Sequence, residues 1–367
     1  MTAADLLGFD PADPEFLRDP YPTYGRLREH APLVRTPLGM LLATTHERCT
    51  AVLRDPRFGH GATGAESFLF MDPPQHTRLR SLVSKAFTPR MVERLRPRIE
   101  GIAKQLVDEL PAEADLIARF AYPLPVLVIT ELLGVPANDH ERFRGWSEKL
   151  ARSLDPLLPS DEEAQTLRAR AEFREYFREL IVLRRLWPGD DLLSALVENQ
   201  ELTEDEMVAT CILLLVAGHE TTVNLIANGV LALSRHDMWA LASDRPRQVV
   251  EEVLRYDPPV QLTGRVSLVD TEISAKGEMV LLLLGAANRD PAIFHSPEVF
   301  DPLSSSPRHL AFGLGIHFCL GATLARLEGE IALKELARRE PRLLERAPPY
   351  KENLVLRGLA RLQVRLS

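Results

Sequence analysis

The chain has few cysteines, and they lie far apart. Only Cys49, Cys211 and Cys319 occur among 367 residues, which excludes a disulfide-stapled secreted fold, and no CxxC pair is present to hold structural zinc. Long apolar runs are also missing, because the longest, around 212–217 and 279–287, fall well short of the ~20 residues that span a bilayer. The N-terminus lacks the basic and apolar regions of a signal peptide. We therefore expect a soluble, cytoplasmic protein without a membrane segment.

An excess of basic residues is missing as well. Lys and Arg number 44 against 52 Asp and Glu, which gives a formal net charge of -8. Nucleic-acid binders carry a cationic excess that neutralises phosphates, so we expect no nucleic-acid partner. The sequence shows no solenoid-length repeat, no low-complexity tract and no dividing linker. We therefore expect a single domain over residues 1–367.

Apolar periodicity and helix punctuation predict a mainly α-helical protein with small β-sheets, an α+β class. The longest helix begins at the capping-box pattern Thr203-Glu204-Asp205-Glu206 and is apolar nearly all round over 207–217, so it should be buried. Helices are expected at 21–30, 47–54, 75–87, 88–110, 125–133, 138–154, 161–186, 191–198, 203–234, 248–256 and 320–339. Strands are expected in a hairpin at 33–45, at 260–269, 272–274 and 280–284, and as a pair near 355–366, whereas 59–65 shows no periodicity.

The most informative stretch is residues 312–321, which read FGLGIHFCLG. Two glycines allow a backbone to approach another group closely, and Cys319 comes just before a predicted helix, whose N-terminus favours a thiolate. An isolated cysteine would favour a buried structural role, whereas this ten-residue pattern favours a reactive or metal-binding thiolate at Cys319. A dinucleotide fingerprint is excluded because Phe318 stands where its third glycine belongs, and a zinc-protease helix is excluded because Val223 stands where its second histidine belongs.

The loop resembles the haem-binding signature of the cytochrome P450 superfamily, and three further segments resemble that family in the expected order. The resemblance covers nearly the whole chain and implies a soluble, bacterial-type haem-thiolate monooxygenase. In that fold, haem b lies between a long distal helix and a proximal cysteine loop and helix. Cys319 would be the axial iron ligand, with Phe312 beside the sulfur. The implied cofactor-binding residues are His76, Arg80, Arg265, Phe312, Gly313, His317, Cys319 and Gly321.

The longest helix carries Ala217-Gly218-His219-Glu220-Thr221-Thr222, which is similar to the family's oxygen-activating segment. Small residues at Ala217 and Gly218 let a helix pass close over a flat cofactor. Thr221 can donate to the carbonyl of Ala217, and Glu220 supplies an ionisable group for proton delivery. We therefore take these four residues as catalytic. Taken alone, the threonine could simply be satisfied by its own backbone, with Glu220 at the surface.

Two further segments complete the resemblance. Glu252 and Arg255 form an i,i+3 pair that alone would be a weak solvated ion pair. In the family the matching pair is buried and structural, and we expect Arg308 or His309 as a third partner. Residues 72–80, DPPQHTRLR, resemble the segment that anchors the haem propionates, for which cationic donors are suited.

The resemblance also implies a largely apolar substrate pocket, with Gln261 and Thr263 as possible polar contacts. Its expected lining is Phe68, Phe70, Leu213, Ala217, Val260, Leu262 and Leu356. Such a site suits small lipophilic molecules without specifying which one, or whether hydroxylation, epoxidation or coupling takes place. The chain is shorter than is usual in the family around 58–71, which predicts a more open pocket, and the trimmed segments 234–246 and 270–279 predict compact surface loops.

No nicotinamide or flavin fingerprint is present, so electrons must come from a partner, which the resemblance indicates is a ferredoxin with its reductase. A locally basic stretch offers a docking surface, although several of its members could be ion-paired: Arg78, Arg80, Lys85, Arg90, Arg94, Arg96 and Arg98. A peroxide-driven peroxygenase and a non-catalytic haem-binding docking protein are the alternatives. Both are disfavoured by the intact Glu220-Thr221 pair. We expect a monomer.

Overall fold

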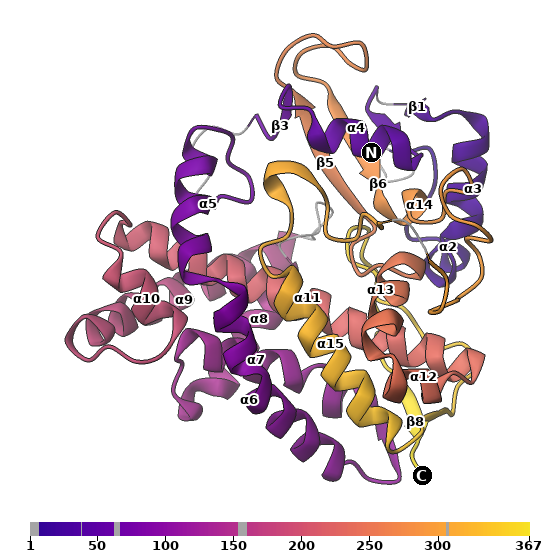
Figure 1. Cartoon of the computed structure of the whole chain (residues 1–367). Coiled ribbons are helices and arrows are strands. Elements are labelled where there is room, and N and C mark those ends of the chain that lie inside the picture. Colours follow the sequence, from indigo (N-terminus) through magenta and orange to yellow (C-terminus); the bar gives the residue numbers. More distant parts are fainter. Residues whose placement is uncertain (1–6, 38, 62–66, 153–159, 306–307) are drawn as a thin grey trace.

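The computed structural model describes residues 7–37, 39–61, 67–152, 160–305 and 308–367. Helices dominate it and two small sheets accompany them, as the sequence predicts (Figure 1). The unpatterned loop expected at 59–65 falls mostly outside the described residues. The helices are α2 (Pro14–Arg18), α3 (Tyr21–His30), α4 (His46–Arg54), α5 (Gln75–Ala86), α6 (Pro89–Asp108), α7 (Pro123–Leu133), α8 (His140–Arg152), α9 (Ser160–Leu186), α10 (Leu192–Glu198), α11 (Glu204–His236), α12 (Trp239–Asp244), α13 (Pro246–Tyr256), α14 (Leu284–Ala287) and α15 (Ala322–Ala337).

Helix α11 is the central element of the core. The predicted capping box is confirmed: Thr203 Oγ1 accepts from the backbone N–H of Glu206, and the Glu206 carboxylate accepts from that of Thr203. The helix packs against α7, α8, α9, α13 and α15. It is long and apolar enough to cross a membrane, but 78% of its most apolar 18-residue window is buried inside the protein. Its apolar character is therefore accounted for by the core.

The larger sheet has the order β1-β2-β6-β5-β3 and lies to one side of the helical bundle (Figure 1). Its strands are β1 (Leu33–Arg35), β2 (Leu41–Ala43), β3 (Phe58–Gly59), β5 (Leu262–Ser267) and β6 (Met279–Leu283). The predicted N-terminal hairpin is confirmed, with Val34 opposite Leu42.

The smaller sheet corrects one prediction. It has the order β4-β8-β7 and consists of β4 (Glu113–Asp115), β7 (Arg342–Leu343) and β8 (Gln363–Arg365). Only β8 lies within the pair expected near 355–366, and its partners come from elsewhere in the chain. The predicted loop at 234–246 is also wrong in part, because α12 occupies its centre.

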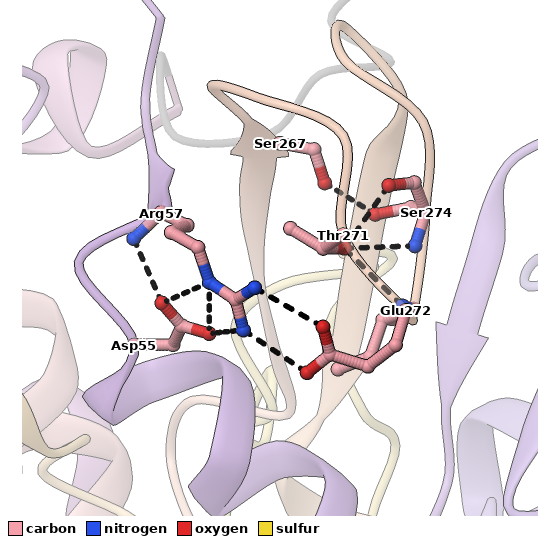
Figure 2. Close-up of polar contacts among 7 residues, drawn as sticks. Asp55, Arg57, Ser267, Thr271, Glu272 and Ser274 are labelled. Atoms are coloured by element: carbon pink, nitrogen blue, oxygen red, sulfur yellow. Dashed lines mark hydrogen bonds and ion pairs between the residues drawn. The ribbon is translucent and has the colours of Figure 1, made fainter.

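The strand predicted at 272–274 is a turn instead. Thr271 Oγ1 accepts from the backbone N–H of Ser274 at 3.0 Å and donates to the carbonyl of the same residue at 3.0 Å (Figure 2). Short hydroxyl side chains compete in this way with the hydrogen-bond ladder of a sheet. The turn makes the β5–β6 connection compact, as the short segment 270–279 predicts.

An ion-pair network holds β3 at the edge of the larger sheet. The guanidinium of Arg57 bonds to the carboxylates of Asp55 and Glu272, which joins the end of α4 to the β5–β6 loop (Figure 2). Just beyond, Phe58 pairs with Ser267 and Gly59 with Val266. The residue that follows β3, His60, is thereby placed next to the strand that carries Arg265.

Candidate functional site

The cysteine loop is folded by its own backbone and packed on α4. The backbone N–H of Cys319 donates to the carbonyl of Phe312 at 3.0 Å. Gly313 and Gly315 have φ of 65° and 71°, in the left-handed region that favours glycine. A Cβ on Gly315 would also collide with the backbone oxygen of Leu53 in α4. These glycines therefore fix the loop against the sheet side of the molecule and present Cys319 at the start of α15.

The surroundings of Cys319 suit a metal-bound thiolate. Backbone amides of Gly321 and Ala322 donate to its sulfur, and the charges of Arg80 and Arg326 also favour the anion. Burial is the larger effect, however, and raises the pKa of the Cys319 thiol above its usual value. A cation bound directly at the sulfur would reverse this balance, because a coordinating thiol is deprotonated outright.

The middle of α11 has an exposed turn between two buried stretches of the helix. Residues on both sides are buried, yet Ala217 and Gly218 are exposed and Thr221 is half-buried. Thr221 Oγ1 donates to the carbonyl of Ala217 at 2.7 Å, as the sequence predicts. An exposed pair of small residues within a core helix is the surface that a flat, apolar group would cover. The geometry therefore fits a haem lying against this turn.

His219, on the same turn, faces the other way. Its Nδ1 lies 2.7 Å from Ser147 Oγ, and its ring packs edge-on against Tyr122 at a centroid distance of 4.4 Å. This side chain is fully buried in contacts with neighbouring helices, so its role is structural.

Basic side chains gather at the other end of the site. The ring of His317 lies 4.2 Å from that of His76 and 4.8 Å from that of His60, centroid to centroid. Arg80 donates to the carbonyl of Phe318 at 2.7 Å, and Arg265 is buried close enough to repel all three rings. We call these five residues the cationic cluster, after the charge of its two arginines.

Asp72 is the carboxylate that raises the pKa values of His60, His76 and Arg265, but no ion pair joins it to these side chains among the described residues. Both ring nitrogens of His76, and Nε2 of His60 and of His317, are buried without a hydrogen-bond partner among the described residues. Burial and then the charge of Arg265 lower the pKa of His60 to about 4 and that of His317 to about 3. Burial lowers the pKa of Arg265 to about 10. Two buried carboxylates, such as the propionates of haem, would supply the missing acceptors.

His60 was missed in the sequence, where it stands in a stretch without periodicity. Its backbone N–H and that of Gly61 donate to the carboxylate of Asp72, at 2.9 and 2.8 Å. A Cβ on Gly59 would collide with the same carboxylate. Asp72 and the pairing of β3 with β5 thus aim the His60 ring at His317. The motif Gly-His-Gly next to a strand was the available signal.

The residues expected to line the pocket differ in burial and in the neighbours that they contact. Phe68 is buried with the Arg80 guanidinium 5.7 Å from its ring centroid, whereas Phe70 is exposed and contacts the His60 ring at 5.6 Å. Val260 and Leu356 are joined by an antiparallel bridge. Leu213 is half-buried one turn before Ala217 on α11.

Two residues expected at the pocket, Leu262 on β5 and Gln261 just before it, face away from Arg265. Leu262 packs in a separate apolar cluster with Tyr24, Leu283 and Ala286, on the face of the strand opposite to Arg265. Gln261 points away as well, because its Nε2 donates to the carbonyl of Pro258 at 2.8 Å. Thr263 is on the same face as Arg265, whose Nη1 lies 3.4 Å from its hydroxyl.

The Glu252–Arg255 pair is buried and bidentate, with N···O distances of 2.8 and 2.7 Å, as the resemblance implies. The expected third partner is wrong. Arg255 donates to the backbone carbonyls of Asn288, Pro297 and Val299, while His309 lies 3.2 Å from Glu251. Backbone carbonyls on the segment before the cysteine loop therefore complete the pair.

Four members of the basic stretch are ion-paired, namely Arg78 with Glu206, Arg94 with Asp190, Arg96 with Glu93 and Arg98 with Glu131. Arg80 belongs to the cationic cluster. Lys85 and Arg90 are exposed and have no ion pair within the described part of the chain. Ion pairing of several members is what the sequence analysis allowed for, and it leaves Lys85 and Arg90 as the exposed cations of this stretch.

Comparison with known proteins agrees with this geometry. A family model described as cytochrome P450 matches residues 246–339. Cytochrome P450 monooxygenase PikC of Streptomyces venezuelae is 43% identical over 96% of this chain and 92% of its own length. A crystal structure of P450BioI in complex with hexadec-9Z-enoic acid ligated acyl carrier protein superposes with a TM-score of 0.92, at 37% identity over 97% of this chain and all of the other. Ligand-free CYP164A2 of Mycobacterium smegmatis gives 0.90 at 47% identity, over 97% and 98% of the two chains.

Proposed function

The chain belongs to the cytochrome P450 family and is a haem-thiolate monooxygenase that binds haem b, and from that premise we propose roles for its own residues, its substrate class and its electron donor. Haem, when bound, supplies the iron at which dioxygen is reduced and one oxygen atom is passed to the substrate. The observation that carries the proposal is the exposed turn at Ala217 and Gly218 between two buried stretches of α11. In this proposal Cys319 binds the iron, with Gly313, Gly321 and Phe312 shaping the loop around the sulfur.

In this proposal Thr221 and Glu220 deliver protons on the distal side of the haem. The hydroxyl of Thr221 bonds to the carbonyl of Ala217, which weakens the helical ladder and leaves a polar groove beside the cofactor surface. Glu220 is buried next to it and brings an ionisable group to the groove. The cationic cluster holds the propionates and orients the macrocycle relative to this turn.

Replacing Thr221 with alanine tests the proton role. The Thr221→Ala variant should bind haem and substrate normally, but its product per electron should fall roughly tenfold as reducing equivalents are diverted to hydrogen peroxide, equivalent to ~1.4 kcal/mol in the relevant barrier. Thr222→Ala is the matched control, because Thr222 makes the same kind of bond, to the carbonyl of Gly218 at 2.8 Å, but is buried. Unchanged coupling in Thr221→Ala would contradict the assignment.

The substrate in this proposal is a small lipophilic molecule. Phe68, Leu213, Val260 and Leu356 are apolar and the polar candidate Gln261 faces away, so binding depends mainly on apolar burial. The acyl chain bound in the P450BioI complex is of this chemical class. Screening lipophilic compounds for the optical shift that accompanies displacement of iron-bound water would identify the substrate, and a response confined to polar compounds would contradict the proposal.

The electron donor in this proposal is a small acidic ferredoxin, reduced by its own reductase, that docks near Lys85 and Arg90 in the cytoplasm. Lys85 lies in the last turn of the haem-anchoring helix α5 and Arg90 in the first turn of α6, and both are free of ion pairs among the described residues. A monomer suffices for this arrangement, since all the site residues come from one chain. Exposed cations attract an anionic partner and raise its association rate.

The rate of first-electron transfer from an acidic ferredoxin should therefore fall at least roughly tenfold as salt rises from ~0.05 to 0.5 M, because the Debye length shrinks to a few Å. Lys85→Glu and Arg90→Glu should slow transfer at low salt without changing the haem spectrum. Lys276→Glu, on the exposed β5–β6 loop, is the matched charge reversal and should have no effect. A salt-independent rate, unaffected by either reversal, would move the docking site elsewhere.

A further inference from the structure

Glu220 has a cationic partner that comes from the far end of the chain. Lys351, 131 residues later, donates to its carboxylate. The Glu220 side chain is 12% exposed and that of Lys351 is 32% exposed, so the pair extends from the buried helix to solvent. Nothing about α11 requires this contact for packing, because the apolar residues around Glu220 already bury the helix.

The segment that carries Lys351 is held against this turn of α11 by its own backbone hydrogen bonds and by a close approach to Asn224. We call residues 349–360 the C-terminal strap. Its two ends are joined by the bond from Ala360 N–H to the carbonyl of Pro349 at 2.8 Å, and by that from Lys351 N–H to the carbonyl of Gly358 at 2.9 Å. A side chain on Gly358 would collide with Asn224, one turn beyond Glu220. The backbone of Lys351 is therefore held close to the catalytic turn.

The tip of the C-terminal strap is fastened to the wall of the substrate pocket. Gln261 N–H donates to the carbonyl of Val355 at 2.8 Å, and Arg357 N–H donates to that of Pro259 at 2.8 Å. Between these two bonds, Leu356 bridges to Val260. One hydrogen-bonded unit thus supplies both a pocket residue and the partner of Glu220.

We propose that Lys351 is a positioning residue for proton entry. Through their ion pair it holds the Glu220 side chain at the solvent edge of α11. There Glu220 takes a proton from water and passes it to the groove beside Thr221, after which the ion pair forms again. The monooxygenase reaction consumes two electrons and two protons per dioxygen, and one oxygen atom leaves as water. Lys351 keeps its own proton throughout. This inference rests on the proton role proposed for Glu220.

The test compares Lys351→Met, Lys351→Arg and Glu220→Gln in the haem-loaded enzyme with a ferredoxin system and hexadec-9Z-enoic acid as the probe. Peroxide formed per NADPH should rise in Lys351→Met towards the level of Glu220→Gln, with a larger solvent deuterium isotope effect on NADPH consumption. The expected size is roughly tenfold, the low end of what one acid–base group contributes. Lys351→Arg keeps a cation and should stay near wild type. Lys104→Met, which breaks the surface pair with Asp108, is the matched control and should change nothing.

The double variant separates positioning from structure. Once Glu220 is glutamine there is no carboxylate to hold, so adding Lys351→Met should cause no further change, whereas damage to the C-terminal strap would add to the first effect. Normal coupling in Lys351→Met beside defective Glu220→Gln, or additive effects in the double variant, would overturn the inference. Normal coupling in Glu220→Gln itself would instead overturn the proton role on which the inference rests.

Discussion

Replacing Cys319 with histidine should abolish the red-shifted Soret band that thiolate ligation gives to the reduced, CO-bound protein. The band depends on electron donation from the sulfur, which an imidazole does not reproduce. Cys319 is the cysteine whose sulfur accepts amides at a helix N-terminus and lies near two arginines. The expected effect is complete loss of the band, with haem content measured separately so that failure to bind haem is not mistaken for a change of ligand.

The other two cysteines are the matched controls. Cys49 and Cys211 are fully buried, and burial raises the pKa of both thiols. Cys49→Ala and Cys211→Ala should leave the band intact, even where the lost packing lowers the melting temperature. A band that persists in Cys319→His, or disappears in either control at normal haem content, would refute the assignment.

The parts of the site that depend on residues close together in the sequence could be predicted from the sequence alone. The Thr221–Ala217 bond spans four residues of one helix, and the turn at Cys319 depends on two glycines within seven residues. Such features need only helical periodicity and the conformational freedom of glycine. The capping box of α11 and the buried Glu252–Arg255 pair are short-range in the same sense.

The features that sequence reasoning missed depend on register and on distant pairing. Leu262 was assigned to the pocket, but residues three apart on a strand face opposite sides, so Leu262 lies on the face away from Arg265. Gln261 precedes the strand and turns away because its side chain bonds to the carbonyl of Pro258. His60 reaches the cationic cluster only because β3, two residues long, pairs with a strand more than two hundred residues away. Lys351 meets Glu220 across 131 residues. No local pattern encodes these contacts.

Replacing Arg265 with leucine should weaken haem retention while sparing the haem-free fold. Arg265 is 7% exposed, and burial already lowers its pKa to about 10. It also repels His60 and His317. Without haem, its removal relieves a buried charge that forms no ion pair among the described residues, so the free energy of unfolding of the apoprotein should stay level or rise. With haem, removal leaves a buried carboxylate without its partner, which costs about 3–5 kcal/mol, or roughly a hundredfold or more in haem dissociation rate.

Arg357→Leu provides the contrast, because Arg357 is equally buried but has its own carboxylate. Its guanidinium bonds to Asp257 at 2.7 Å and to the backbone carbonyls of Leu17 and Arg18. Removing it should destabilise the apoprotein and leave haem dissociation nearly unchanged. The two quantities are measured by urea unfolding of the haem-free proteins and by haem transfer to excess apomyoglobin. If Arg265→Leu behaves like Arg357→Leu in both assays, Arg265 supports the fold and not the cofactor, and the cationic cluster must find its anion elsewhere.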